Sequence, residues 1–492
     1  MTDQPLPPDP APTPADAAPK SKRRQRVMGW VKFTLRWGIA VVGIWLVVQQ
    51  IYLHDRVWVI QGDQLVPRVL TQPLPANANE PQTFQTDQGP VKWDDTANKP
   101  DLKSVKVRTP AGVTDAPLVG LDLRGDLNKP RLERVFVIAP DPANPRASIG
   151  QWLHASQLVD PYHVRVPYPR VETGLLTMIR QANGWLLLLA VLIFPVTFVV
   201  TSVRWDMLLR ALDIHISLAR AFVLNMVGAF YNSFMVGSTG GDILKAYYVS
   251  KHTTHRTRAV LSVVVDRIIG LLALVLMGGV MATIQYLTAG PADPAGHACG
   301  RIALVSTAVL VAAVLGFLVL GHPTWRRATG TEFLLGKLPK QKQVKSAVQT
   351  MEIYARRPLL VLGTLLMTLP VHVTVVLSAM LASKAFGLTI SPLYYFVAVP
   401  VIVLVGAIPI SPQGAGVMEY FAILLLARQG ATVSQAFALT MSIRMVQILW
   451  NLTGGIFVFR GGYHQPTERE REDLESDTPA TPAVPGAPAT VV

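Results

Sequence analysis

Apolar residues along this chain gather into stretches of roughly 20 residues or more, each long enough to cross a hydrocarbon core of about 30 Å as a helix. Polar connectors separate them, and the longest connector follows the first stretch. The stretches cover residues 33–53, 185–205, 219–250, 259–286, 302–320, 359–386, 392–427 and 436–459. This pattern predicts an all-α polytopic membrane protein.

Two of these stretches, 219–250 and 392–427, are interrupted by residues that disfavour a continuous helix. The first interruption contains Gly237, Gly240 and Gly241. The second contains Pro409, Pro412, Gly414 and Gly416. Each stretch is therefore predicted to form two shorter helices joined by an irregular segment.

Charge indicates how these stretches cross the membrane, because Lys and Arg accumulate in short cytoplasmic loops. Bases lie on both sides of 219–250: Arg204, Arg210 and Arg220 before it, Lys251, Arg256 and Arg258 after it. A single crossing cannot have both ends on one face, so we predict a re-entrant hairpin, and 392–427 becomes a second hairpin that enters from the opposite face. The prediction is about six full spans plus two oppositely oriented re-entrant hairpins. The alternative is a pair of kinked full spans.

The same rule orients the whole chain. Bases precede the first stretch, at Lys20, Lys22, Arg23, Arg24 and Arg26, and the connector 321–358 is also rich in Lys and Arg. Loop 288–300 contains neither. We expect a multi-pass protein of the cell inner membrane with both termini in the cytoplasm.

Composition divides the chain into five parts. Residues 1–32 are predicted to be a disordered basic tail, 33–53 an uncleaved first transmembrane helix, 54–182 a periplasmic insert, 183–460 the main transmembrane domain and 461–492 a disordered cytoplasmic tail. Within the insert, Val105–Arg108, Leu121–Arg124 and Val135–Ile138 have the pattern of short strands between turn residues. We therefore expect the insert to be small and β-rich.

Composition also excludes several classes of function. Half of the residues are hydrophobic and only 15% are charged, as expected for a membrane protein. The formal net charge of +14 is placed beside apolar segments, which favours anionic lipid and not nucleic acid as the partner. Cys299 is the one cysteine, so neither an internal disulfide nor a cysteine metal cluster can form. No nucleotide or metal motif is visible, and we expect no cofactor and no metal.

Ionisable residues inside membrane segments are costly and are therefore candidates for function. The candidates are the bases Lys245, Arg267 and Arg444 and the acids Asp242, Asp266 and Glu419. Five of the six also have a structural interpretation. Asp242 can cap a helix, Asp266 and Arg267 can form an ion pair, Glu419 can complement a helix dipole, and Arg444 can join Gln447 and Asn451 in a polar seam. For His372, in mid-span, we expect an interhelical hydrogen bond.

At these residues the chain resembles the lysylphosphatidylglycerol synthase transmembrane family, whose members are also called flippase-like. The matching pieces are Arg204-Trp205, Gly240-Gly241-Asp242 with Lys245, Asp266 to Leu271, Ile408 to Pro412 with Gly414, Gly416 and Glu419, and Arg444. The resemblance covers roughly 184–460 and the first span. Family members often carry Pro before the Gly-Gly-Asp loop and Arg where Lys245 stands, and they usually lack the insert 54–182.

The resemblance implies the lipid-translocating membrane unit of the multiple peptide resistance factor, without its aminoacyl-transferase domain, and hence no enzyme activity. We expect a phospholipid flippase, and aminoacylated phosphatidylglycerol is one possible substrate. Its head group would bind near the midplane, in contact with Gly240, Gly241, Asp242, Lys245, Asp266, Arg267, Glu419 and Arg444. The alternatives are a membrane enzyme acting on lipid-linked precursors, with an acid among these residues as base, and an accessory subunit. The insert could contact a second copy or an envelope partner.

Overall fold

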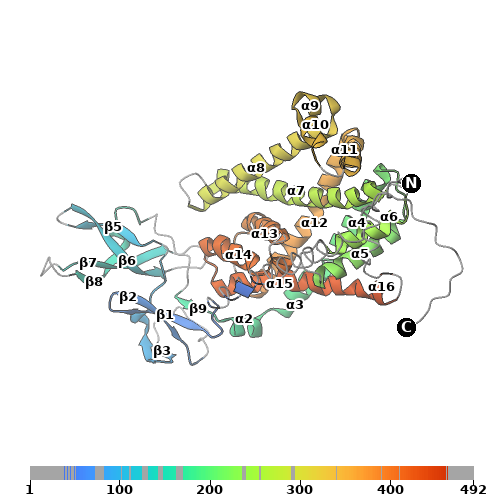
Figure 1. The fold of residues 1–492 in the computed structure, drawn as a ribbon. Helices are drawn as coiled ribbons and strands as arrows, with labels where there is room; N and C mark the ends of the chain where they lie inside the picture. Colours follow the sequence, from blue (N-terminus) through green and yellow to red (C-terminus); the bar gives the residue numbers. More distant parts are fainter. Residues whose placement is uncertain are drawn as a thin grey trace, which may run out of the picture.

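The protein is described by a computed structural model that places a β-rich unit at one end of a helical bundle (Figure 1). It describes residues 51–72, 83–100, 102–109, 112–124, 131–141, 148–161, 170–234, 240–253, 256–289, 294–338, 341–388, 390–408 and 411–460, with Gly38, Val41, Val42, Trp45, Gln49 and Tyr463. Apart from Tyr463, the two predicted tails lie outside these residues, as do most of the predicted first helix, 33–53, and Gly237 and Pro409.

Among the described residues, five helical segments are long and apolar enough to cross a membrane: Gly184–Ala211, Arg256–Thr288, Gly296–Gly321, Pro358–Ala385 and Val433–Phe459. They coincide with five of the predicted full spans. The first consists of α3 (Gly184–Leu192) and α4 (Val196–Ala211), which Pro195 separates. The others are α7 (Arg256–Ala289), α8 (Pro294–Gly321), α12 (Pro358–Ala385), and α15 (Val433–Thr453) with α16 (Gly455–Phe459). The prediction of a polytopic α-helical membrane protein is confirmed.

The two interrupted stretches each form a pair of shorter helices. α5 (Leu218–Phe234) packs against α6 (Gly240–Ser250), and α13 (Pro392–Ala407) packs against α14 (Val417–Leu426). A short 3-10 turn, η5 (Pro412–Gly414), lies between the second two. The predicted breaks are therefore present in both stretches.

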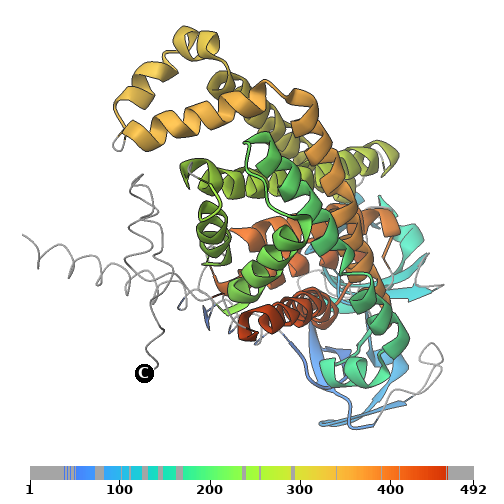
Figure 2. The same cartoon turned by 90° about the vertical axis from the view of Figure 1, so that its right-hand side faces the viewer.

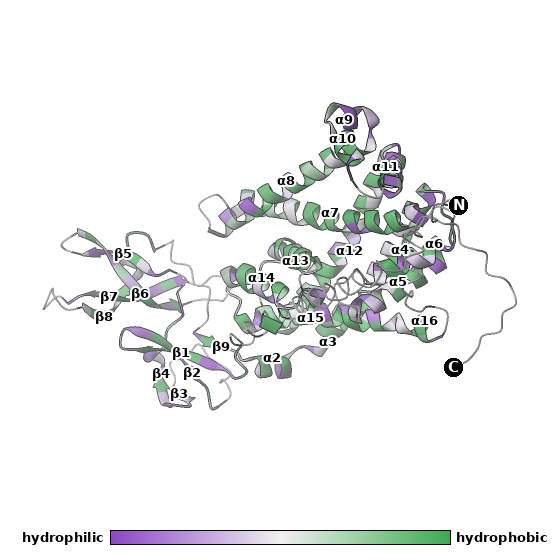
Figure 3. Ribbon diagram, viewed as in Figure 1, coloured by the Kyte–Doolittle hydropathy of each residue, from purple (hydrophilic) through white to green (hydrophobic). Residues whose placement is uncertain are grey.

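Two hydrophobic clusters hold the bundle together. One joins α4, α5, α6 and α7 around the fully buried Trp205, and includes Tyr354 of α11 (Gln341–Ala355). The other joins α7, α12, α13, α14 and α15 around Tyr394 and Tyr395. Each broken pair thus belongs to its own cluster. Figure 3 shows how strongly apolar residues dominate the bundle compared with the β-rich unit.

The chain between α8 and α11 forms a lateral arm. It contains the short helices α9 (Pro323–Ala328) and α10 (Thr331–Gly336), which contact each other, while α9 also contacts α8. In two perpendicular views α9 and α10 lie at one edge of the molecule, beside the bundle (Figures 1 and 2).

The insert is β-rich, as its alternating sequence predicted, and its described strands form three antiparallel sheets. The largest has the order β5-β6-β7-β8, formed by Ser104–Thr109, Gly112–Arg124, Arg131–Pro140 and Ser148–His154. A second has the order β2-β1-β9, formed by Gln64–Val69, Arg56–Gln61 and Val171–Glu172. The hairpin β3-β4 pairs Thr83–Thr86 with Gly89–Lys92. The three predicted strand segments lie in β5, β6 and β7. The helix α2 (Leu175–Gln181) then leads from the insert into α3.

Candidate functional site

The first break is held by a close approach of two backbones. A Cβ atom on Gly241 would lie 1.8 Å from the carbonyl oxygen of Gly228, so only glycine fits where α6 begins beside α5. The Gly241 N–H donates to Oδ1 of Asn232 at 2.8 Å. Gly241 therefore acts in the packing of this break, and Asp242 occupies the first turn of α6, which begins at Gly240.

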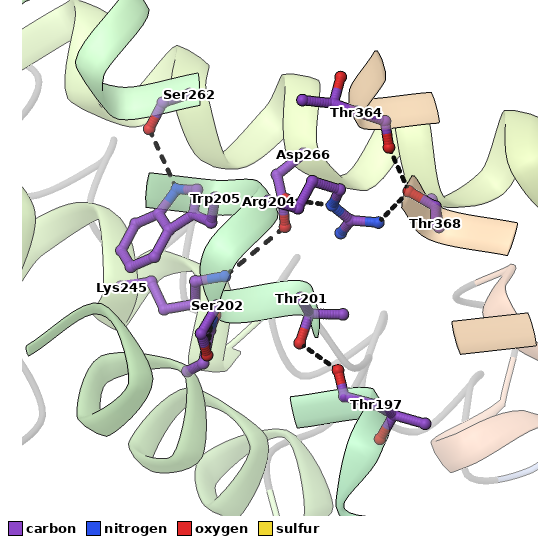
Figure 4. Close-up of polar contacts among 12 residues, drawn as sticks. Thr197, Thr201, Ser202, Arg204, Trp205, Lys245, Ser262, Asp266, Thr364 and Thr368 are labelled. Atoms are coloured by element: carbon purple, nitrogen blue, oxygen red, sulfur yellow. Dashed lines mark hydrogen bonds and ion pairs between the residues drawn. The ribbon is translucent and has the colours of Figure 1, made fainter. Parts of the chain in front are cut away.

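Behind this break, Asp266 of α7 receives two cations that arrive on different helices (Figure 4). Arg204 Nε donates to Asp266 Oδ1 at 2.8 Å, and Lys245 Nζ lies 3.7 Å from Asp266 Oδ2. Arg204 also donates through Nη1 to the Thr368 hydroxyl at 3.0 Å, which in turn donates to the Thr364 carbonyl. We call Arg204, Lys245 and Asp266 the Asp266 cluster. All three side chains are buried.

Lys245 is further held by an aromatic ring. Its Nζ lies 4.3 Å from the ring centroid of Trp205, whose indole N–H donates to the Ser262 hydroxyl at 3.4 Å. A ring face at this distance attracts a cation without neutralising it. The Asp266 cluster therefore contains two positive charges and one negative charge in a buried position.

Asp242 and Arg267 form a separate ion pair. Arg267 Nε lies 2.5 Å from Asp242 Oδ2, and the two side chains are 39% and 19% exposed. Asp266 and Arg267 were candidates for an ion pair with each other, but each has its own partner on a different helix. Neighbouring positions on α7 point in different directions, which explains this separation.

The second break has unusual backbone angles and a buried acid. Gln413, Gly414 and Gly416 have positive φ values of 49°, 70° and 82°. Glu419 accepts from the Gly416 N–H through Oε2 at 2.7 Å, and its Oε1 lies 2.8 Å from Nη2 of Arg444 in an ion pair whose alignment does not meet hydrogen-bond geometry. Glu419 thus caps the N-terminus of α14, as its dipole interpretation predicted. It also neutralises the charge of Arg444.

The two breaks are joined to each other by side chains. Gln413 Nε2 donates to the Ser233 carbonyl at 2.9 Å, and Asn451 Nδ2 donates to the Ser233 hydroxyl at 2.9 Å. The last described turn of α5 therefore contacts both η5 and α15. Arg444 and Asn451 of the predicted polar seam bond to different breaks. The interhelical hydrogen bond expected for His372 is confirmed, because its Nε2 lies 2.9 Å from the Gly270 carbonyl oxygen.

The predicted site residues fall into three charged groups and not one. These are the Asp266 cluster, the Asp242–Arg267 pair and the Glu419–Arg444 pair. Sequence reasoning missed the pairing of Arg204 with Asp266, although an arginine at the end of an apolar stretch was a usable signal. It also missed Gln413, Ser233 and Thr368, for which charge and hydropathy supply no signal. Among the described residues, no group of three or more His, Cys, Asp or Glu side chains could hold a metal ion.

Comparisons with known proteins agree with this architecture. The sequence model of the lysylphosphatidylglycerol synthase transmembrane region matches residues 173–455, which include both broken stretches and every charged group above. A UPF0104 membrane protein of Pyrococcus horikoshii is 25% identical over 101 residues, covering 20% of this chain and 30% of that protein. No solved structure matches the chain. The match over more than half of its length shows that this chain belongs to the lysylphosphatidylglycerol synthase transmembrane region family.

Proposed function

We propose that this protein is a flippase-like transporter that moves a phospholipid head group past the two breaks. The observation that carries the proposal is the link from Gln413 to Ser233, which joins two broken helix pairs that both carry buried charge. Broken helices at membrane depth are a recurring feature of transporter binding sites. Aminoacylated phosphatidylglycerol is the substrate suggested by the family's description.

Helix length supports the re-entrant arrangement within this proposal. α6 has 11 residues and α14 has 10, so they extend about 16 and 15 Å. Neither can cross a hydrocarbon core of about 30 Å alone. In a re-entrant hairpin, α6 and α14 each return to the membrane face where the partner helix entered, so neither has to cross the whole core. The arrangement would place both termini in the cytoplasm and the insert in the periplasm.

Charge balance favours a phosphate as the bound group. Arg204 and Lys245 share the single carboxylate of Asp266, while the other two pairs are each neutral. An unbalanced buried charge is costly, and a bound anion would reduce that cost. The start of α6 lies beside this cluster, and a helix N-terminus also favours an anion.

The Asp242–Arg267 pair is the one we assign to exchange with the head group. It is the most exposed of the three charged groups, whereas Glu419 is 2% exposed and already bound to Arg444. When the pair opens, Arg267 can contact the phosphate and Asp242 can accept a hydrogen bond from an amine. This assigns the amine to Asp242 in preference to Glu419.

Leaflet exchange in proteoliposomes tests the proposal. Proteoliposomes would contain fluorescent phosphatidylglycerol or its fluorescent lysyl ester. A membrane-impermeant reductant then destroys the fluorophores of the outer leaflet, so further loss of fluorescence measures lipid exchange between leaflets. We expect the wild type to accelerate exchange and Asp242→Asn/Arg267→Gln to slow it at least fivefold. The matched control is Lys106→Gln/Asp115→Asn, which neutralises two exposed, opposite charges that lie across from each other on β5 and β6. Wild-type exchange equal to that of empty liposomes would overturn the proposal, and a change in lipid mass would indicate an enzyme.

A further inference from the structure

The lateral arm exposes large apolar side chains that no other described part of the chain covers. Trp325 is 50% exposed, Phe333 66% and Leu334 63%, and Leu338 beside them is also exposed. These four residues belong to α9, α10 and the turn after it. Large aromatic and aliphatic side chains at this exposure mark a surface that contacts something apolar.

Exposed cationic side chains lie in the same connector as these apolar residues, 322–357. Arg327, Lys337, Lys345, Arg356 and Arg357 are all exposed. Lys337 lies 4.2 Å from the ring centroid of Phe333, so a charge and an apolar anchor are held together on one short segment. Glu332 and Glu352 are the acids of the connector 322–357, and each is paired with an arginine. The connector 322–357 therefore has an excess of positive charge.

The root of the arm fixes it close to the end of a candidate span. α9 begins at Pro323, two residues after α8 ends at Gly321. The buried Arg326 donates to the Leu320 carbonyl at 2.6 Å and pairs with Glu352 of α11. These contacts hold the start of the arm against the end of α8 and against α11. The arm lies at one edge of the molecule (Figure 2).

We propose that α9 and α10 are an interfacial anchor that inserts into the head-group region of an anionic bilayer leaflet. Trp325, Phe333, Leu334 and Leu338 enter the boundary between head groups and acyl chains, while Arg327 and Lys337 contact lipid phosphates. Aromatic and aliphatic residues beside bases are the pattern of interfacial membrane helices. Clustered bases beside a span are attracted to anionic lipid. This anchor does not depend on lipid translocation.

A fluorescence experiment on the full chain tests the anchor. In a Cys299→Ala background, Phe333→Cys carries an environment-sensitive dye, and the protein is placed in nanodiscs of phosphatidylcholine with or without phosphatidylglycerol. Quenching by spin-labelled lipid is compared with the same dye at Val113→Cys, an equally exposed position in the insert. We expect at least threefold stronger quenching at 333 than at 113, increasing with phosphatidylglycerol. Arg327→Gln/Lys337→Gln should remove that increase.

Three results would overturn the anchor. One is equal quenching at 333 and 113 in all discs, which would mean that the arm faces water. Another is quenching at 333 that phosphatidylglycerol does not increase. The third is protection at 333 that appears only in discs with two copies of the protein, which would assign the surface to a protein contact. Leu334→Cys is a second labelling position if Phe333→Cys fails to fold.

Discussion

Gln413 donates a hydrogen bond to the carbonyl of Ser233 across 180 residues of sequence, and so joins the two breaks of the bundle. Gln413 itself has a positive φ of 49°, a conformation that is uncommon outside glycine. A side chain from one break thus satisfies a backbone group at the other. If one break moves relative to the other, this hydrogen bond must be lost; if the bond is kept, the two breaks must move together.

Gln413→Ala should therefore uncouple the breaks more than it destabilises the protein. Loss of one hydrogen bond of this kind costs about 1 kcal/mol, so the thermal unfolding midpoint should shift little. Leaflet exchange should change at least threefold, because the relative position of the breaks is no longer fixed. Gln429→Ala, which alters a glutamine outside both breaks, is the control. An exchange rate identical to that of the wild type would contradict a coupling role for Gln413.

Asp266→Ala should be the most destabilising of the charge substitutions. It leaves Arg204 and Lys245 buried without their shared carboxylate, a change that costs about 3–5 kcal/mol in comparable buried pairs. The measurement is the free energy of unfolding in detergent, compared with Glu332→Gln, whose exposed pair contributes at most about 1 kcal/mol. Adding Lys245→Met should recover part of the loss. No recovery in the double variant would argue against charge imbalance as the cause.

Substitutions at Glu419 should separate the stability contributed by capping α14 from that contributed by the ion pair with Arg444. Glu419→Gln keeps an oxygen that can accept from the Gly416 N–H, but it leaves Arg444 without a counter-charge. Glu419→Ala removes both. We expect Glu419→Gln to lose most of the stability that Glu419→Ala loses, because charge pairing is the larger contribution. If the glutamine variant melts like the wild type, capping alone explains this residue.

Gly241→Ala should disrupt the first break by steric contact alone. The added methyl group would lie 1.8 Å from the Gly228 carbonyl oxygen, which forces α5 and α6 apart. We expect a loss of at least about 1–3 kcal/mol in stability. Gly363→Ala is the matched control, because its Cβ would meet nothing within 4 Å in α12 and alanine favours a helix. Equal melting of the two variants would contradict the close approach.

Asp122→Asn should loosen the insert without affecting the bundle. Asp122 of β6 forms ion pairs with Arg134 of β7 and with Arg170, and both its side chain and that of Arg170 are buried. Burial lowers the pKa of Arg170, and the Asp122 carboxylate opposes this shift. Without the carboxylate, limited proteolysis should cleave within 54–182 several times faster, while the thermal midpoint of the bundle stays constant. A matching loss in both parts would show that they unfold together.

Much of the architecture could be predicted because hydropathy and helix breakers act locally. The predicted bounds of the two broken stretches, 219–250 and 392–427, lie within one residue of the outer ends of the pairs α5–α6 and α13–α14. Gly, Pro and apolar periodicity determine such boundaries. The strands of the insert were visible from alternation in segments such as Val105–Arg108. The ion-pair partners of the charged residues could not be predicted in this way. Lys245 lies three positions after Asp242 in the sequence, yet its ion pair is with Asp266 of α7, at 3.7 Å.

Hydropathy and residue type were enough to predict a polytopic helical membrane protein, the places where its two helix pairs break, and the ionisable residues in its apolar stretches. These features follow from the cost of placing polar groups and unpaired backbone in a bilayer, which acts on each segment separately. The packed structure was needed to see that Asp266 joins Arg204 to Lys245, that Glu419 pairs with Arg444, and that Gln413 bonds to Ser233. Such pairings depend on how helices distant in sequence pack, and one chain's local pattern does not contain that information.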